Sequence, residues 1–347
     1  PEAGHHRQQQ HEASRFTVVT WVRAFGIHAT RPTRANREKS GHQLKSVLKR
    51  PAIKINTRAI PAGIPALHQR TRRWWLLVLA AVISMAALNG CATQESPTLL
   101  VKGPNSEVAY PVDTIIDGRR GKPLSKQEMI DELATVQLVF VGERHNARVH
   151  HDIQLQILQA LHQRHPDLKV GMEMFDRSYQ KLLNEWSQGR LEEEAFVERS
   201  HWRSNWRFSY ELYRDILDFI KAERLQLVGL NIPFHIPPKI ALGGIDSLTE
   251  ADAAFLPEQI DTADAAHRQY VEEIFEKHAR FGRSNFDYFY SAQCVWEDIM
   301  AESIAAQLEG GVMVVLIGNG HIIEKFGVPN RAVDRTGASM RTVYPVS

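Results

Sequence analysis

Four apolar runs along the chain each end abruptly in polar residues. They span residues 136–141, 168–175, 225–232 and 312–317. Unbroken runs of this length fit strands that are buried on both faces, as in a parallel sheet. Segments with helical character separate them, at residues 125–134, 147–163, 176–200, 209–224, 262–280 and 284–308. Strands that alternate with helices predict an α/β fold with a largely parallel sheet flanked by helices.

Two helical stretches are longer than a crossover between neighbouring strands requires. They cover residues 176–200 and 248–308, so we expect a small helical subdomain from insertions within about 176–308. Ser125 with Glu128 has the spacing of a capping box, which predicts a helix start there. A last strand near residues 341–344 closes a domain that we place at 114–347.

Polar side chains stand at the ends of the four runs. The first and last runs lead into Gly142-x-x-His145 and Gly318-x-x-His321, and the second and third end at Glu173 and Asn231. The carboxyl ends of parallel strands share one edge of the sheet, where ligands bind in open α/β folds. We therefore expect these residues to converge. Two histidines and a carboxylate are what a metal site or an acid–base site requires.

The helix predicted over residues 147–163 carries two more histidines in its first turn. Asn146 is a candidate N-cap. His150 shares a face with Ile153, Ile157 and Leu161, so it should point toward the sheet, with His151 beside it.

An aromatic and basic cluster occupies residues 201–213. It offers flat apolar rings and the charges of Arg203 and Arg207, and its Tyr or His side chains could ligate a haem iron; the same residue types also occur in ordinary domain contacts. Tyr210 follows Trp206 at a helical spacing, so both could face one cleft with Arg207. A second aromatic run at residues 286–296 is typical of a helix core, apart from Tyr290.

Charge is distributed unevenly along the chain. Residues 1–70 hold 13 Lys or Arg against 3 acidic residues, whereas the part after Cys91 holds 27 basic and 37 acidic residues. An acidic body argues against a nucleic-acid binder, which would carry a basic stripe. We expect residues 1–70 to be a disordered basic arm or untranslated, with a start such as Leu67.

Residues 71–90 have the layout of a signal peptide. Arg72 and Arg73 precede an apolar run over residues 74–88, which is short against the roughly 20 residues that span a bilayer. The run ends in Leu-Asn-Gly-Cys91, which resembles a bacterial lipobox, so Cys91 is a candidate lipidation site on a tether of residues 91–113. Ala92 follows the cysteine, and by resemblance to other bacterial lipoproteins this residue favours a location of the protein at the outer membrane. Cys294 would then be the only other thiol, which excludes an intramolecular disulfide.

The chain resembles the ChaN-like haem-binding lipoprotein family, in the larger group of Tiki and TraB proteins. The resemblance rests on residues 142–158 and 318–329, on the spacing of Trp202, Trp206 and Tyr210, and on residues 292–304, and it covers roughly 114–346. It implies a lipid-anchored protein of iron acquisition that binds haem at a homodimer interface through a Tyr assisted by His. The candidate cofactor-binding residues are Tyr210, Tyr290, His145, His150, His151, His321, Trp206 and Arg207.

A metal-dependent hydrolase is the alternative hypothesis, because Tiki proteins and erythromycin esterases share similar motifs. In that interpretation a divalent metal ion would be held by His145, His321 and Glu173, and Glu143 or Glu173 would activate water.

Overall fold

The computed structural model describes residues 18–22, 98–102, 107–278 and 285–347. All of them belong to one compact unit. The predicted signal peptide, Cys91 and most of the predicted basic arm lie outside the described residues. The predicted tether of residues 91–113 is described in part and contains two strands, at residues 98–102 and 107–111. No helix of the described part is long and apolar enough to cross a membrane.

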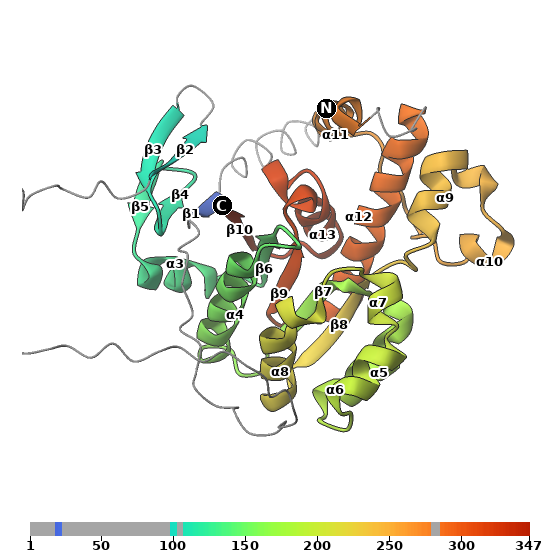
Figure 1. Ribbon diagram of the computed structural model, residues 1–347. Coiled ribbons are helices and arrows are strands. Elements are labelled where there is room, and N and C mark those ends of the chain that lie inside the picture. The colour runs from blue at the N-terminus through green and yellow to red at the C-terminus, as the bar shows by residue number, and fades with distance from the viewer. Residues whose placement is uncertain (1–17, 23–97, 103–106, 279–284) are drawn as a thin grey trace, which may run out of the picture. The chain divides into compact units, whose positions relative to one another are not determined.

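An eight-stranded sheet organises the described part of the chain, in the order β5-β4-β1-β10-β6-β9-β7-β8 (Figure 1). The six strands from β1 to β8 in this order are mutually parallel, and β4 and β5 add an antiparallel edge. β2 and β3 form a separate antiparallel pair. The strands are β1 Val18–Val22, β2 Thr98–Lys102, β3 Glu107–Pro111, β4 Thr114–Asp117, β5 Lys122–Leu124, β6 Leu138–Glu143, β7 Lys169–Asp176, β8 Gln226–Asn231, β9 Met313–Gly318 and β10 Met340–Val346.

Helices connect the strands, which confirms the predicted α/β class. They are α3 Lys126–Leu133, α4 Arg148–His162, α5 Gln180–Ser187, α6 Glu193–Arg199, α7 Trp202–Asn205, α8 Arg214–Ala222, α9 Ile236–Gly243, α10 Glu250–Ala253, α11 Ala265–His278, α12 Phe286–Leu308 and α13 Val328–Thr336. Short 3-10 turns lie at Arg177–Tyr179, Tyr210–Leu212, Ile245–Ser247, Asn319–His321 and Ile323–Lys325.

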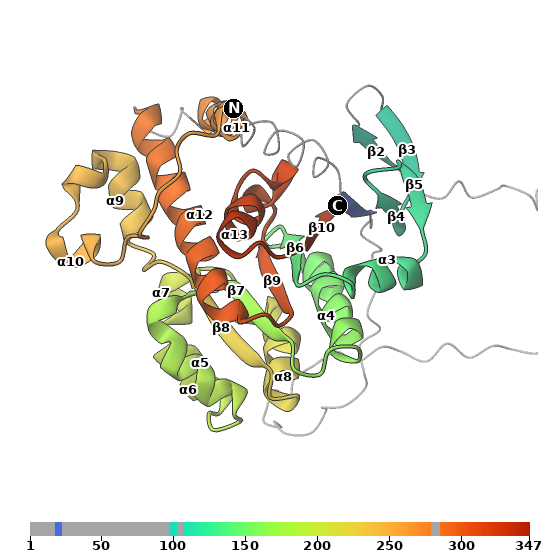
Figure 2. The same ribbon diagram turned by 180° about the vertical axis from the view of Figure 1, so that it is seen from behind.

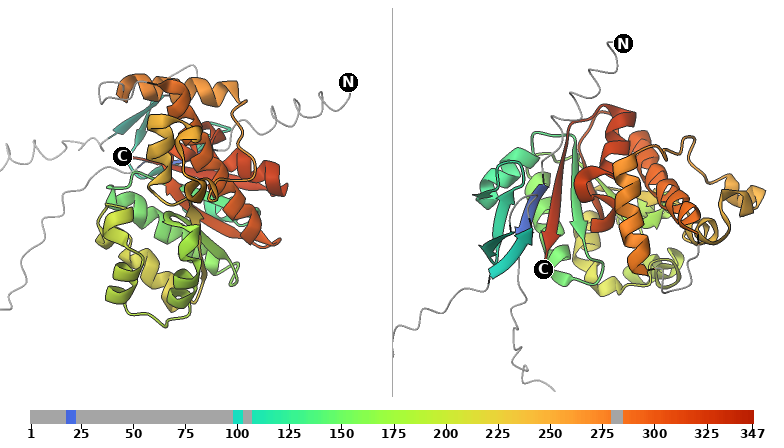
Figure 3. Two further views of the ribbon diagram at one scale, coloured as in Figure 1. Left: turned by 90° about the vertical axis from the view of Figure 1, so that its right-hand side faces the viewer. Right: turned by 90° about the horizontal axis from the view of Figure 1, so that it is seen from above.

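The two faces of the sheet bury two separate apolar clusters, because successive strand residues point to opposite faces. Val139 and Val141 of β6 join the cluster under α3, α4, α5 and α8 (Figure 1). Leu138 and Phe140 join the cluster under α9, α12 and α13 (Figure 2). Seen from above in Figure 3, the sheet lies between these helical layers. Burial on both faces explains why the strands read as continuous apolar runs.

Some boundaries differ from the predictions. The predicted capping box at Ser125 and Glu128 is present. The predicted helical segment of residues 176–200 contains two helices, α5 and α6, and Gly189 between them adopts a left-handed backbone at φ 69°. Asn146 is not the N-cap of α4: that position is Ala147, which makes no side-chain capping bond.

Strand β1 falls in the segment for which the sequence predicted no folded element. Val18–Val22 pairs with β10 and β4 and fills the sheet between them. Its sequence, VVTWV, is β-branched and aromatic and therefore suits a strand. The basic composition around it outweighed this short signal in the prediction.

Two glycines allow the polar loops after β6 and β9 to pack against each other. A Cβ atom at Gly142 would lie 2.1 Å from Asn319 Oδ1, and one at Gly318 would lie 2.8 Å from His145 Cε1. Glu143 is paired with Gly318 in the parallel register of the two strands. Because each of these glycines lacks a Cβ atom, the loop of the other Gly-x-x-His motif can pack into the space beside it.

We predict that Gly318→Ala and Gly142→Ala each lower the free energy of unfolding by about 1–3 kcal/mol, the usual cost of overpacking a tight contact. Gly320→Ala is the matched control. No heavy atom lies within 4 Å of a Cβ built there, so its effect should stay within about 0.5 kcal/mol. Urea unfolding of the three variants measures this difference, and equal effects at all three glycines would contradict the packing account.

Candidate functional site

The carboxyl ends of β6, β7, β8 and β9 bring together the four residues predicted there from the sequence, His145, Glu173, Asn231 and His321. Glu143 and Glu173 are each 1% exposed, Asn231 is fully buried, and His321 lies in the 3-10 turn directly after β9. Asn231 Nδ2 donates a hydrogen bond to the Glu173 carbonyl at 2.8 Å, which joins the ends of β8 and β7. The predicted convergence at one sheet edge is therefore what the structure has.

Glu143 holds two histidines and a tyrosine around one carboxylate. Its Oε1 lies 2.7 Å from His145 Nδ1 and accepts a hydrogen bond from the Tyr213 hydroxyl at 2.6 Å. His151 Nε2 lies 3.1 Å from Oε2. Burial alone raises the pKa of Glu143, but the hydrogen bond with His145 and the nearby His151 ring outweigh it and lower the pKa to about 2. Glu143 is therefore a buried anion that orients the His145 ring.

His321 lies between two buried carboxylates. Its Nε2 is 3.5 Å from Glu173 Oε1, and its Nδ1 is 3.2 Å from Oε1 of Glu297 on α12. Burial lowers the pKa of His321, but the charges of Glu173 and Glu297 outweigh burial and raise it to about 10. Burial likewise raises the pKa of Glu297, and its hydrogen bonds with His267 and His321 bring it down to about 2. The three side chains form an imidazolium between two carboxylates.

The Glu143–His145 pair and the Glu173–His321 pair meet above Gly318. A Cβ atom at Gly318 would lie 3.1 Å from His145 Nε2 and 3.3 Å from Glu173 Oε2. The Gly318 N–H donates a hydrogen bond to the same Glu173 oxygen at 2.6 Å. Burial lowers the pKa of His145, but the Glu143 hydrogen bond and the Glu173 charge raise it above its ordinary value. The two motifs thus build one site with alternating charges.

Part of the charge network was missed by sequence reasoning. Glu297 also contacts His267 of α11 at 3.2 Å and accepts a hydrogen bond from the Gln293 side chain at 2.7 Å. Arg331 of α13 lies 3.6 Å from Glu297 and pairs with the neighbouring Asp298. A carboxylate pair inside a long apolar helix was the only signal for this network. This charge network links α11, α12 and α13 to His321.

His150 points toward the sheet as predicted, but it does not join the Glu143 contacts. Its Nδ1 accepts a hydrogen bond from the Arg144 backbone N–H at 2.9 Å, and its Nε2 lies 3.1 Å from Ser347 Oγ. Burial and the Arg144 charge lower the pKa of His150 to about 4. A neutral His150 therefore fixes the backbone of the first motif.

Aromatic rings surround His145, whose side chain remains 29% exposed. The ring centroids of Trp206 and Phe208 lie 4.7 and 4.9 Å from that of His145. Arg207 is exposed and has a left-handed backbone at φ 67°. His145 is thus a partly exposed imidazole that lies beside two aromatic side chains.

The predicted helical spacing from Trp206 to Tyr210 was wrong. α7 ends at Asn205, and the left-handed Arg207 separates it from the 3-10 turn at Tyr210–Leu212. Tyr213, which belongs to the predicted aromatic cluster of residues 201–213 but was not favoured as a ligand, donates its hydroxyl hydrogen to Glu143. The Tyr210 hydroxyl is buried without a hydrogen-bond partner, and burial raises its pKa.

Tyr290 belongs to another apolar cluster with Val271 and Cys294. Its hydroxyl donates to the Asp264 carbonyl at 3.3 Å and lies 3.5 Å from His267 Nδ1. Burial raises the pKa of Tyr290. The structure therefore places it behind the Glu297 network and away from the exposed His145 ring.

A tyrosine–histidine pair lies just beyond the end of β7. The Tyr179 hydroxyl is 2.9 Å from His201 Nδ1 and accepts a hydrogen bond from Asn205 Nδ2 at 3.2 Å. His201 precedes α7 in a left-handed conformation, at φ 51°. Asn205 is followed directly by Trp206, so one short segment connects this pair to the aromatic side chains beside His145. Tyr179 was not singled out in the sequence because no motif surrounds it.

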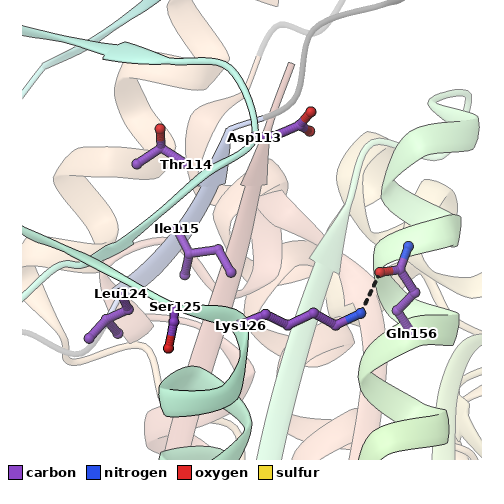
Figure 4. A pocket seen from close by; sticks show the side chains of 7 residues that line it. All are labelled: Asp113, Thr114, Ile115, Leu124, Ser125, Lys126 and Gln156. Carbon is purple, nitrogen blue, oxygen red and sulfur yellow. Dashed lines mark hydrogen bonds between the residues drawn. The ribbon is translucent and has the colours of Figure 1, made fainter.

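The described residues hold no evident metal site, and they form a cleft away from the two motifs. No group of three or more of their His, Cys, Asp or Glu side chains is arranged to hold a metal ion, and both ring nitrogens of His321 already face carboxylates. A cleft of about 430 Å³ lies beside β4, α3 and α4, where Lys126 Nζ donates to Gln156 (Figure 4). None of the motif residues lines it.

Comparisons with known proteins agree with this fold. The family model described as haem-binding uptake, Tiki superfamily, ChaN matches residues 129–332. The structure of ChaN of Campylobacter jejuni with cofacially bound haem is 17% identical, with a TM-score of 0.55, over 67% of this chain and 90% of that one. An erythromycin esterase mutant in its open conformation is 16% identical, with a TM-score of 0.38, over 63% and 72%. A comparison with curated proteins gave no match.

We predict that His321→Gln costs about 3 kcal/mol near pH 6, because it removes the cation between two buried carboxylates. The folded pKa of His321, about 10, lies above the ordinary value of about 6.5. Its contribution is therefore complete below about pH 6.5 and is lost as the pH rises toward 10. Urea unfolding at pH 6, 8 and 10 should show the wild-type advantage shrinking, and an advantage that does not change with pH would contradict the imidazolium assignment.

Proposed function

The chain belongs to the haem-binding uptake family of ChaN proteins in the Tiki superfamily, and on that premise we propose that it binds ferric haem for iron acquisition through the phenol of Tyr179. The observation that carries the ligand assignment is the contact between Tyr179 and His201. When bound, haem would supply a Lewis-acidic ferric iron, and phenolate is one of the ligands that ferric haem accepts.

The hydrogen bonds of Tyr179 fit this role. Asn205 donates to the phenol oxygen, so the phenol hydrogen is free to be donated to His201 Nδ1. A base within hydrogen-bond reach takes up the proton when the oxygen becomes a ligand. The Tyr179 side chain is half-buried and His201 is exposed, so a flat ligand can reach the pair from solvent.

The two tyrosines favoured from sequence fit less well. Tyr210 and Tyr290 are 8% and 1% exposed, and burial raises the pKa of both phenols, which opposes the phenolate form. The Tyr210 oxygen also has no neighbour to receive its proton. His145 with Trp206 remains a candidate surface for the rest of the ligand, because its ring is partly exposed beside aromatic side chains.

Hydrolysis is a second candidate function, and the buried site at the sheet edge favours it. His145 is held at Nδ1 by Glu143, and its Nε2 faces the space above Gly318 next to Glu173. A partly exposed imidazole oriented by a carboxylate is the arrangement of a general base. A His145→Gln variant that loses an esterase or peptidase activity while still binding haem would assign this activity to the chain.

Membrane attachment and dimer formation remain proposals that follow from the sequence. We propose that Cys91 is the acylated amino terminus of the mature protein, which would hold the domain at the outer membrane. We also propose that haem is bound between two copies of the chain.

Replacing Tyr179 with Phe should raise the Kd for ferric haem at least about tenfold, equal to about 1.4 kcal/mol, because only the ligand oxygen is lost. The absorption spectrum of the ferric complex should change as well. The matched variants Tyr210→Phe and Tyr290→Phe should leave affinity and spectrum unchanged. A spectrophotometric titration of all three compares them directly, and an effect of Tyr210→Phe with none of Tyr179→Phe would reverse the assignment.

Cys91→Ala should leave an unlipidated precursor that keeps residues 71–90, because no lipid can be attached at position 91. Mass spectrometry of the wild-type amino terminus should show a diacyl or triacyl cysteine. A mature protein that starts upstream of Cys91 without lipid would refute the anchor.

A further inference from the structure

A second feature of the Tyr179 region is a cleft of about 250 Å³ that Tyr179 and residues of α5 line. The 3-10 turn at Arg177–Tyr179, the first half of α5 and the end of α6 form its walls. Leu182 is 6% exposed and gives it an apolar contact surface. Its lining residues are Ser178, Tyr179, Lys181, Leu182, Glu185 and Arg199.

The charges that line this cleft leave a positive excess. Arg199 pairs with Glu185 at 2.9 Å, which neutralises both side chains. Lys181 is exposed and forms no ion pair with any other residue that the structure describes. An unpaired ammonium group beside a guanidinium that can exchange its partner attracts a carboxylate from solution.

We propose that this cleft binds the carboxylate side chains of the tetrapyrrole, with Lys181 as the main partner and Arg199 as the second. The inference rests on the proposed function, because Tyr179 forms one wall of the cleft and would hold the iron of the same ligand. It differs from the sequence-based expectation, in which Arg207 was the basic residue among the candidate cofactor-binding residues. Arg207 does not line the cleft, and α7 and the left-handed turn separate it from Arg199.

The charges in the cleft also predict that one substitution should strengthen ligand binding. Glu185 competes with the ligand's carboxylates for Arg199, so its neutralisation should strengthen ligand binding. Glu185→Gln therefore serves as a gain-of-affinity variant that a general loss of folding could not imitate.

The experiment compares ferric haem with its dimethyl ester, in which both carboxylates are blocked. Wild-type protein should bind haem at least about tenfold more tightly than the ester. Lys181→Gln should reduce this preference at least about threefold and Arg199→Gln should reduce it less, whereas Glu185→Gln should increase it. Arg203→Gln and Arg207→Gln, which change exposed arginines of the same region, should leave the preference unchanged.

The possible outcomes distinguish a failure of the carboxylate cleft from a failure of haem binding. Equal affinity of wild type for haem and ester overturns the carboxylate cleft and leaves haem binding intact. A preference that depends on Arg207 and not on Lys181 overturns it as well. If neither ligand binds, the proposed function fails together with the cleft.

Discussion

The close approach of two loops at Gly142 and Gly318 is the constraint on which the site depends. Parallel pairing of β6 with β9 places the two Gly-x-x-His motifs side by side, and only a residue without a Cβ leaves room for the opposite loop. His145 can therefore lie over Gly318, within reach of Glu173. The glycines of the motifs have a packing role, and the histidines have the chemical one.

The alternating charges lower the free-energy cost of burying these ionised side chains. Isolated carboxylates in such positions would be protonated, since burial disfavours the ionised form. Here Glu143 faces His145 and His151, and Glu173 and Glu297 face His321 from both sides. Removing one partner would leave a neighbour charged and unpaired. The helices behind the sheet are therefore tied to the strand ends through Glu297, so packing and site chemistry depend on each other.

Sequence reasoning predicted those parts that follow from local pattern. Buried strands read as apolar runs, Ser125 and Glu128 marked a helix start, and strand-end geometry brought His145, Glu173 and His321 together.

The missed parts depend on tertiary contacts that no spacing reveals. Glu297 reaches His321 from a helix whose apolar neighbours hide it, and Tyr179 meets His201 across two helices. Tyr210 was favoured over Tyr213 because a helix was assumed through Arg207, where the backbone turns left-handed. The haem ligand that we propose, Tyr179, therefore differs from Tyr210 and Tyr290, the tyrosines favoured from the sequence. A crystal structure of the protein grown with ferric haem tests the central claim most directly. The account predicts the iron bonded to Tyr179 Oη, with His201 still hydrogen-bonded to that oxygen; iron bonded to another residue, with Tyr179 away from the haem, would contradict it.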